Sequence, residues 1–331
     1  MVKLSAAESA GSEWAAESAG SEWAAESAGS ESAGSEWAAA PVVPAVSEKQ
    51  LDLLATDDAV SAVLAGQEHV AGVVRSAQPQ ITRAVDLLTR AYEGGGRILL
   101  FGAGASGRLA VQEAVEVPGT YGIPVERIQA RVAGGGSGHL VGSDQAEDDV
   151  DLALSDFSEL AVTELDAVIA VAASGRTPYT CAIAQCAQRA GAAVVTVTNV
   201  AESPLAALAD VAVEVPVGAE VVAGSTRLAA GTAQKLVLNT LTTTTMIRLG
   251  HVHGHYMVDV VAANEKLRHR ISGVVADSTG HSADEAWAAL ERCDWNARAA
   301  IVHLATGADP ATAARQAALS RTVREAVAAL R

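Results

Sequence analysis

The sequence predicts an α/β protein built on a doubly wound, five-stranded parallel sheet, with a small C-terminal three-helix domain. Half of the 331 residues are hydrophobic while only 3% are aromatic, as expected where small side chains pack around buried strands. Between residues 98 and 215, short β-branched runs alternate with helical stretches, which is typical of parallel strands joined by helices. A chain of this length can bury one large domain and a small appendage.

The N-terminal segment differs from the rest of the chain in composition. Residues 6–37 repeat the unit AAESAGSEW, and residues 1–40 contain seven glutamates and one lysine. A segment so rich in Ser, Gly and Glu buries too little apolar surface to offset the entropy lost on ordering. We therefore expect residues 1–44 to form a low-complexity, disordered tail.

Residues 45–271 are expected to form the main domain, which opens with a helix. The apolar residues Ile81, Ala84, Val85 and Leu88 recur at the spacing of one helix face. Three consecutive glycines end this helix. Five strands follow, at residues 98–101, 127–133, 167–172, 193–198 and 211–215. The third and fourth strands have almost no charged residues, so we expect them at the centre of the sheet.

Helices are expected throughout the remainder of the chain. One long helix should span residues 226–250, and another should run from about residue 257 to residue 270. Residues 272–331 are expected to form the small helical domain and a C-terminal helix, with Gly280 and Asp294 near turns.

Composition and charge limit the partners and the location. A net charge of −16 argues against a nucleic-acid partner. No apolar run reaches the length of a membrane span, and the N-terminus lacks the regions of a signal peptide. Cys181, Cys186 and Cys293 are expected to be reduced thiols. We expect a cytoplasmic protein with no membrane contact.

Two glycine loops follow strands. The first, GAGASGR at residues 102–108, matches the dinucleotide pattern G-x-G-x-x-G, but the next strand ends in RVAGGG without the acidic residue that holds a ribose. The second, ASGRTPY at residues 173–179, precedes a helix that Pro178 can start. Backbone N–H groups and hydroxyls at such loops can bind a phosphate. The alternative is that both are tight turns between a strand and a helix.

Four sequence blocks resemble the signatures of the N-acetylmuramic acid 6-phosphate etherases, in the same order. They are ILLFGAGASGRLAVQEAVEVPGTYG, AASGRTPYTCAI, VGAEVVAGSTRLAAGTAQKLVLN and MVDVVAANEKLRHR. The resemblance runs from about residue 50 to about residue 307. It implies a sugar isomerase (SIS-type) fold and a homodimer. It also implies a lyase that removes D-lactate from an amino sugar phosphate in cell-wall recycling, with no metal or organic cofactor.

The resemblance also implies two catalytic carboxylates, Glu116 and Glu147. Ring opening of the sugar exposes an aldehyde that acidifies the proton on carbon 2, so a base and an acid are needed. We expect Glu116 to be the acid and Glu147 the base or a sugar ligand, although the two roles could be exchanged. The alternatives are a solvated helix end for Glu116 and an acidic surface run for Glu147.

The relatives' substrate-binding positions correspond to a larger set of residues in this sequence. They are Gly104, Ser106, Gly107, Ser174, Gly175, Thr177, Glu220, Ser225, Asn264, Lys266 and Arg270. Arg227 should also line the cleft, whereas Gln234 and Lys235 should organise the following helix. For Asn264, Lys266 and Arg270, the alternative is a charged helix surface.

The chain departs from the family pattern at a few positions. Ala105 replaces a usual threonine, Val117 and Gly119 replace Cys and Pro, and His255 replaces an asparagine; a usual motif before the first helix is also missing. His251, His253 and His255 alternate as metal ligands on a strand would, but no fourth ligand is evident, so no metal is expected.

Two other functions compete with the etherase. A sugar-phosphate isomerase starts from the same acidic carbon-2 proton but yields a ketose and no lactate. The related glucokinase regulatory proteins share the layout, so a regulatory module would bind a sugar phosphate without turning it over.

Overall fold

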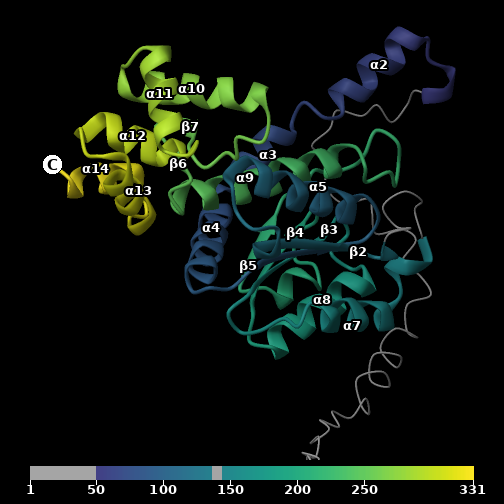
Figure 1. The fold of residues 1–331 in the computed structure, drawn as a ribbon. Helices are drawn as coiled ribbons and strands as arrows, with labels where there is room; N and C mark the ends of the chain where they lie inside the picture. Colours follow the sequence, from purple (N-terminus) through teal and green to yellow (C-terminus); the bar gives the residue numbers. More distant parts are fainter. Residues whose placement is uncertain (1–49, 136–143) are drawn as a thin grey trace, which may run out of the picture. The chain divides into compact units, whose positions relative to one another are not determined.

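Five parallel strands form the central sheet of a computed structural model that describes residues 50–135 and 144–331 (Figure 1). The strands are β1 (Ile98–Gly102), β2 (Ile128–Val132), β3 (Ala167–Ala172), β4 (Ala193–Thr198) and β5 (Val211–Glu214). All five predicted strands are confirmed. The predicted tail, residues 1–44, lies outside the described residues.

The strand order in the sheet is β2-β1-β3-β4-β5. β3 is central and β4 is an inner strand between β3 and β5, as predicted. β1 is the other inner strand, and its residues are likewise uncharged and buried. β2, the next strand along the chain, pairs with β1 on one side, and β3 pairs with β1 on the other side. The carboxyl ends of β1 and β3 therefore form a topological switch point, where open α/β sheets bind ligands.

Helices cover both faces of the sheet, which confirms the doubly wound arrangement (Figure 1). The helices on the face of Ile98 and Leu100 are α3 (Val70–Ser76), α4 (Gln78–Glu93), α5 (Gly104–Tyr121) and α9 (Ala229–Arg248). The helices on the face of Leu99 and Phe101 are α7 (Val150–Glu159) and α8 (Pro178–Arg189). Alternate residues of β1 thus enter two separate cores.

Helix α4 confirms the predicted amphipathic helix. Ile81, Ala84, Val85 and Leu88 are all buried against the sheet. Burying each of the larger three side chains contributes about 1.5–3 kcal/mol. The helix ends at Glu93, and its C-cap is Gly94, the first of the three consecutive glycines.

Shorter helices complete the described part of the main domain. They are α2 (Thr56–Ala65) and the 3-10 helices η2 (Leu51–Leu53), η3 (Val125–Arg127), η4 (Asp144–Glu147) and η5 (Ala206–Leu208). Within the described ranges, no helix combines the length and apolar character needed to cross a membrane.

The helix that follows α9 begins later than predicted. An antiparallel pair, β6 (Val252–His253) and β7 (Tyr256–Met257), comes first, and α10 spans Glu265–Thr279. Asn264 starts this helix because its Oδ1 accepts a hydrogen bond from the Leu267 N–H at 2.9 Å. The apolar run before Asn264 therefore forms strand and loop, and the expected boundary at residues 271/272 falls inside α10.

Helices α10 to α14 share a third core, which confirms the helical C-terminal region. The last four are α11 (Ala283–Arg292), α12 (Ala297–Thr306), α13 (Pro310–Leu319) and α14 (Val323–Ala329). Val275, Leu290 and Val302 lie in this core and are fully buried. Where one C-terminal helix was expected there are two, because the hydroxyl of Thr322 and the carboxylate of Glu325 form a capping box that starts α14.

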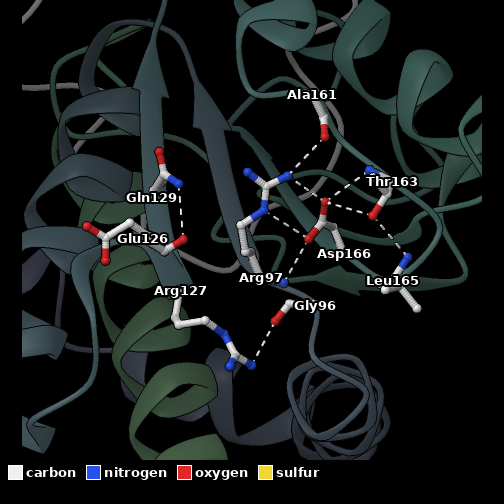
Figure 2. A network of polar contacts seen from close by, with 9 residues as sticks. All are labelled: Gly96, Arg97, Glu126, Arg127, Gln129, Ala161, Thr163, Leu165 and Asp166. Carbon is white, nitrogen blue, oxygen red and sulfur yellow. Dashed lines mark hydrogen bonds and ion pairs between the residues drawn. The ribbon is translucent and has the colours of Figure 1, made fainter.

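A polar network ties the amino ends of the central strands together, at the edge opposite the switch point (Figure 2). The buried Asp166 carboxylate accepts hydrogen bonds from the Arg97 backbone N–H at 2.8 Å and from Arg97 Nη2 at 2.7 Å. Arg97 Nε at 3.1 Å and the Thr163 N–H at 3.0 Å also donate to it, and Arg127 Nη2 donates to the Gly96 carbonyl at 2.9 Å. Because Arg97 precedes β1 and Asp166 precedes β3, this network stabilises the register of the two strands that carry the glycine loops.

Candidate active site

The first glycine loop joins β1 to the amino end of α5. Gly104 begins the helix, and Ser106 in its first turn is 8% exposed. A Cβ on Gly107 would lie 2.4 Å from the Gly102 carbonyl oxygen, so only glycine lets the helix start this close to the strand. The N-cap residue, Ala103, makes no side-chain hydrogen bond. The first N–H groups of α5 can therefore donate to an anion.

The second glycine loop joins β3 to α8. Ser174 Oγ accepts a hydrogen bond from the Arg176 N–H at 3.2 Å, and Thr177 is the N-cap of α8. Gly175 has φ +62°, and a Cβ there would lie 2.2 Å from Ser203 Oγ, so a larger residue would distort the loop. Since β1 and β3 are adjacent and parallel, both loops leave the sheet at the switch point.

Glu147 lies beside the first loop. It ends the short helix η4, and its side chain is exposed. A Cβ built on Gly104 would be 4.0 Å from Glu147 Oε2. This carboxylate is therefore within reach of a ligand held at the amino end of α5.

Glu116 lies far from that point within the same chain. It is exposed on α5, twelve residues after Gly104, and at 1.5 Å per residue this is about 18 Å along the helix axis. One chain therefore does not bring Glu116 and Glu147 within reach of adjacent atoms of one sugar.

Glu220 and Ser225 lie in the segment before α9. Both carboxylate oxygens of Glu220 accept backbone hydrogen bonds at 2.9 Å, from Ala229 N–H and Ala230 N–H. Glu220 therefore caps α9 and compensates its positive end. Ser225 is half-buried in a turn in which its N–H donates to the Val222 carbonyl.

The residues around α10 that were predicted to contact the substrate lie at the start of this helix and in its exposed first turns. Asn264 is the N-cap, as described above, so its Oδ1 already has a partner. Lys266 and Arg270 are exposed, and neither side chain makes a hydrogen bond or ion pair with another described residue. The structure thus shows Asn264 as the N-cap of α10 and joins the side chains of the two cations to neither loop.

Sequence reasoning missed a buried carboxylate, Glu113, which is 2% exposed between α5 and α9. Its Oε1 accepts a hydrogen bond from Thr242 Oγ1 at 2.5 Å, and its Oε2 accepts from Asn239 Nδ2 at 2.7 Å. Lys235 Nζ forms an ion pair with Oε2 at 3.3 Å. The signal was in the sequence, because Glu113 shares the apolar helix face of Ala110 and Val117.

A groove of about 640 Å³ lies between α5 and α9, with one end at the first glycine loop. Ala105, Arg108 and Gln112 line it from α5. Lys235 and Asn239 line it from α9, and Arg227, which precedes that helix, lines it as well. Lys235 thus connects the buried Glu113 to an open surface.

The three alternating histidines have separate surroundings. His251 Nδ1 lies 2.8 Å from Asp259 Oδ2, and the His255 ring packs against Tyr256. Burial, with the nearby Arg324 charge, lowers the pKa of His253. Across residues 50–135 and 144–331, no group of three His, Cys, Asp or Glu side chains could hold a metal ion.

Comparisons with known proteins identify the family to which the chain is related. Residues 65–199 match the family model of the SIS domain. The N-acetylmuramic acid 6-phosphate etherase of Symbiobacterium thermophilum is 45% identical over 258 residues, which cover 78% of this chain and 86% of the relative. The enzyme of the same name from Aliivibrio fischeri is 41% identical over 267 residues, covering 81% and 89%.

Among solved structures, a phosphoheptose isomerase from Francisella tularensis is similar with a TM-score of 0.45 and 17% identity. The match covers 59% of this chain and 100% of the other.

Proposed function

The chain belongs to the N-acetylmuramic acid 6-phosphate etherase family, and we propose that it removes the D-lactyl group from N-acetylmuramic acid 6-phosphate. The enzyme is a carbon–oxygen lyase, and its products are N-acetylglucosamine 6-phosphate and D-lactate. Identity of 45% across 86% of a curated etherase supports this assignment. Within the site, the observation that carries it is the Glu147 carboxylate beside Gly104, at the loop suited to an anion.

The reaction proceeds in two steps, an elimination and a hydration. First, a base removes the proton from carbon 2 of the open-chain sugar, and the bond between carbon 3 and the ether oxygen breaks. An acid protonates that oxygen, so D-lactate leaves and an unsaturated aldehyde remains. Water then adds its oxygen to carbon 3 and a proton returns to carbon 2. We assign the acid to Glu116 and the base to Glu147, with the exchanged assignment as the alternative.

The two glycine loops hold the phosphate in this proposal. The backbone N–H groups of Gly104 and Ser106 and the hydroxyls of Ser174 and Thr177 supply donors around one anion, while Gly107 lets α5 start close to β1. Gly175 lets the second loop turn tightly. Ser225, Asn264, Lys266 and Arg270 complete the proposed substrate contacts, while Glu220 supports the site through the end of α9.

We propose that the working enzyme is a homodimer in which a second copy supplies Glu116. The separation of about 18 Å along α5 supports this. The neighbour of Glu116, Val115, is 71% exposed, an apolar residue suited to a contact with another subunit. Each site would then combine Glu147 and the loops of one copy with Glu116 of the other.

We further propose that the enzyme acts in the cytoplasm, in the recycling of cell-wall amino sugars. Its three cysteines are free thiols, two of them buried, as is typical of a reducing compartment. The substrate and product of the proposed reaction are amino sugars, which supports a role in their catabolism.

The decisive experiment assays D-lactate from N-acetylmuramic acid 6-phosphate with wild type, Glu116→Gln and Glu147→Gln. We expect release by wild type and its loss in each variant, with sugar-phosphate binding retained. A ketose product without lactate would indicate an isomerase, and binding without turnover would indicate a regulatory module. Either result would overturn the etherase assignment.

Mixing the two inactive variants tests the shared site. If Glu116 acts across the dimer, re-associated mixtures regain about a quarter of wild-type activity, because half of the dimers are mixed and each has one intact site. A mixture that stays inactive after subunit exchange has been verified would contradict the shared site.

A further inference from the structure

We propose that the groove between α5 and α9 is a second anion-binding subsite, which holds the lactyl carboxylate of the substrate. This inference rests on the proposed function and identifies how the enzyme would distinguish its substrate from its product. The substrate carries two anionic groups, the phosphate and the lactyl carboxylate, whereas the amino sugar product carries only the phosphate. A subsite for the carboxylate would therefore favour the substrate.

The charge of the groove is suited to an anion. Arg108, Arg227 and Lys235 line it, and the acidic side chain paired with them is Glu113, through Lys235. The side chains of Arg108 and Arg227 are exposed, and neither forms a hydrogen bond or ion pair with any described residue. The groove thus keeps two uncompensated guanidinium groups in a chain whose net charge is −16, and a guanidinium binds a carboxylate through two parallel hydrogen bonds.

Buried contacts hold the third cation in position. Glu113 is fixed by Thr242 and Asn239, and its Oε2 anchors Lys235 Nζ at 3.3 Å. An ammonium group has three donors, so Lys235 keeps two for a ligand in the groove. Glu113 is therefore a positioning residue for Lys235, which explains a charged side chain buried on the apolar face of α5.

The position of the groove matches the shape of the substrate. Its lining begins at Ala105 in the first glycine loop and continues to Gln112. From Ser106, Arg108 lies about 3 Å and Gln112 about 9 Å further along the helix axis. The phosphate is attached to carbon 6 and the lactyl group to carbon 3, three carbon–carbon bonds apart along the sugar chain, so the two anionic groups lie at separate points of the substrate. A substrate whose phosphate is bound at the loop can therefore extend its carboxylate into the groove.

Steady-state kinetics of Arg108→Gln and Arg227→Gln test the subsite. The KM for N-acetylmuramic acid 6-phosphate should rise about tenfold in each variant, as expected for loss of one charged hydrogen-bonding partner. The inhibition constant of N-acetylglucosamine 6-phosphate, which lacks the carboxylate, should change less than about twofold. Arg75→Gln is the matched control, because Arg75 is an exposed arginine on α3 outside the groove.

Two results would overturn the inference. An unchanged KM in both variants would mean that the groove does not contact the substrate, and a parallel rise in the inhibition constant would place the phosphate there instead. Failure of the proposed function is distinguishable, because wild type itself would then release no lactate. Calorimetric titration of wild type and variants with both sugar phosphates would still test the subsite. The proposal predicts that wild type binds the muramic compound more tightly than N-acetylglucosamine 6-phosphate, and that the variants lose this preference.

Discussion

Replacing Glu113 with glutamine tests how strongly the buried network between α5 and α9 stabilises the fold. The substitution keeps the size of the side chain but turns one acceptor oxygen into an N–H₂ donor. If that group stands at Oε2, it faces two donors, Asn239 Nδ2 and Lys235 Nζ. If it stands at Oε1, it faces Thr242 Oγ1.

The second orientation costs less, which sets the expected magnitude. Thr242 can then accept from the new amide and donate its own proton to the Leu238 carbonyl, which is already 3.1 Å away. The remaining oxygen still accepts from Asn239, but charge-assisted hydrogen bonds become neutral ones. We expect a loss of about 1–2 kcal/mol in the free energy of unfolding. For a folded part of this size, this lowers the melting temperature by about 2–8 °C.

Thermal and urea unfolding followed by circular dichroism would measure this change. Glu116→Gln is the matched control, because it makes the same chemical change at an exposed position of the same helix. It should alter stability by less than about 0.5 kcal/mol. The reasoning would be refuted if Glu113→Gln were as stable as wild type, or if the control lost as much stability.

Two other predictions concern the strands and loops that build the site. In Gly107→Ala, the new Cβ would lie 2.4 Å from a backbone oxygen of β1. We expect Gly107→Ala to lose about 1–3 kcal/mol of stability and to lose lactate release. The control, Gly119→Ala, adds a methyl group in open space on the same helix and should gain up to about 1 kcal/mol. Equal stability of the two variants would contradict the close approach of α5 to β1. The pKa of Asp166 is below its ordinary value. Burial raises this pKa, but the hydrogen bonds from Arg97 and Thr163 lower it by more than burial raises it. Its contribution is therefore present above about pH 4 and lost as the pH falls through the folded-state pKa. In urea titrations, the advantage of wild type over Asp166→Asn should shrink from pH 7 to pH 3, and a constant difference would argue against this linkage.

The fold could be predicted because each strand carries a strong local signal. Uncharged β-branched runs mark β3 and β4, and the glycine loops mark where β1 and β3 end. The order of the inner strands needed the structure, since β1 is as apolar as β4. The start of α10 was misplaced because the apolar residues before it suit a helix or a strand equally. The capping hydrogen bond of Asn264 marks the true start of α10, and its contact with substrate stays a prediction.

The candidate site was less predictable because it depends on distances between segments. Glu147 reaches the first loop through a turn whose path no local pattern specifies. For Glu116, the number of helical residues alone gives the separation of about 18 Å from Gly104. The sequence was therefore enough to argue against a site formed within one chain. Glu113 was overlooked because its three partners come from α9, far along the chain.

The most direct test of the central claim is the reaction of N-acetylmuramic acid 6-phosphate in ¹⁸O-labelled water, with mass spectrometry of both products. Elimination followed by hydration predicts the label in the carbon-3 hydroxyl of N-acetylglucosamine 6-phosphate and unlabelled D-lactate. Label in the lactate would mean that water attacks the lactyl carbon, and would contradict a lyase that breaks the bond between carbon 3 and the ether oxygen.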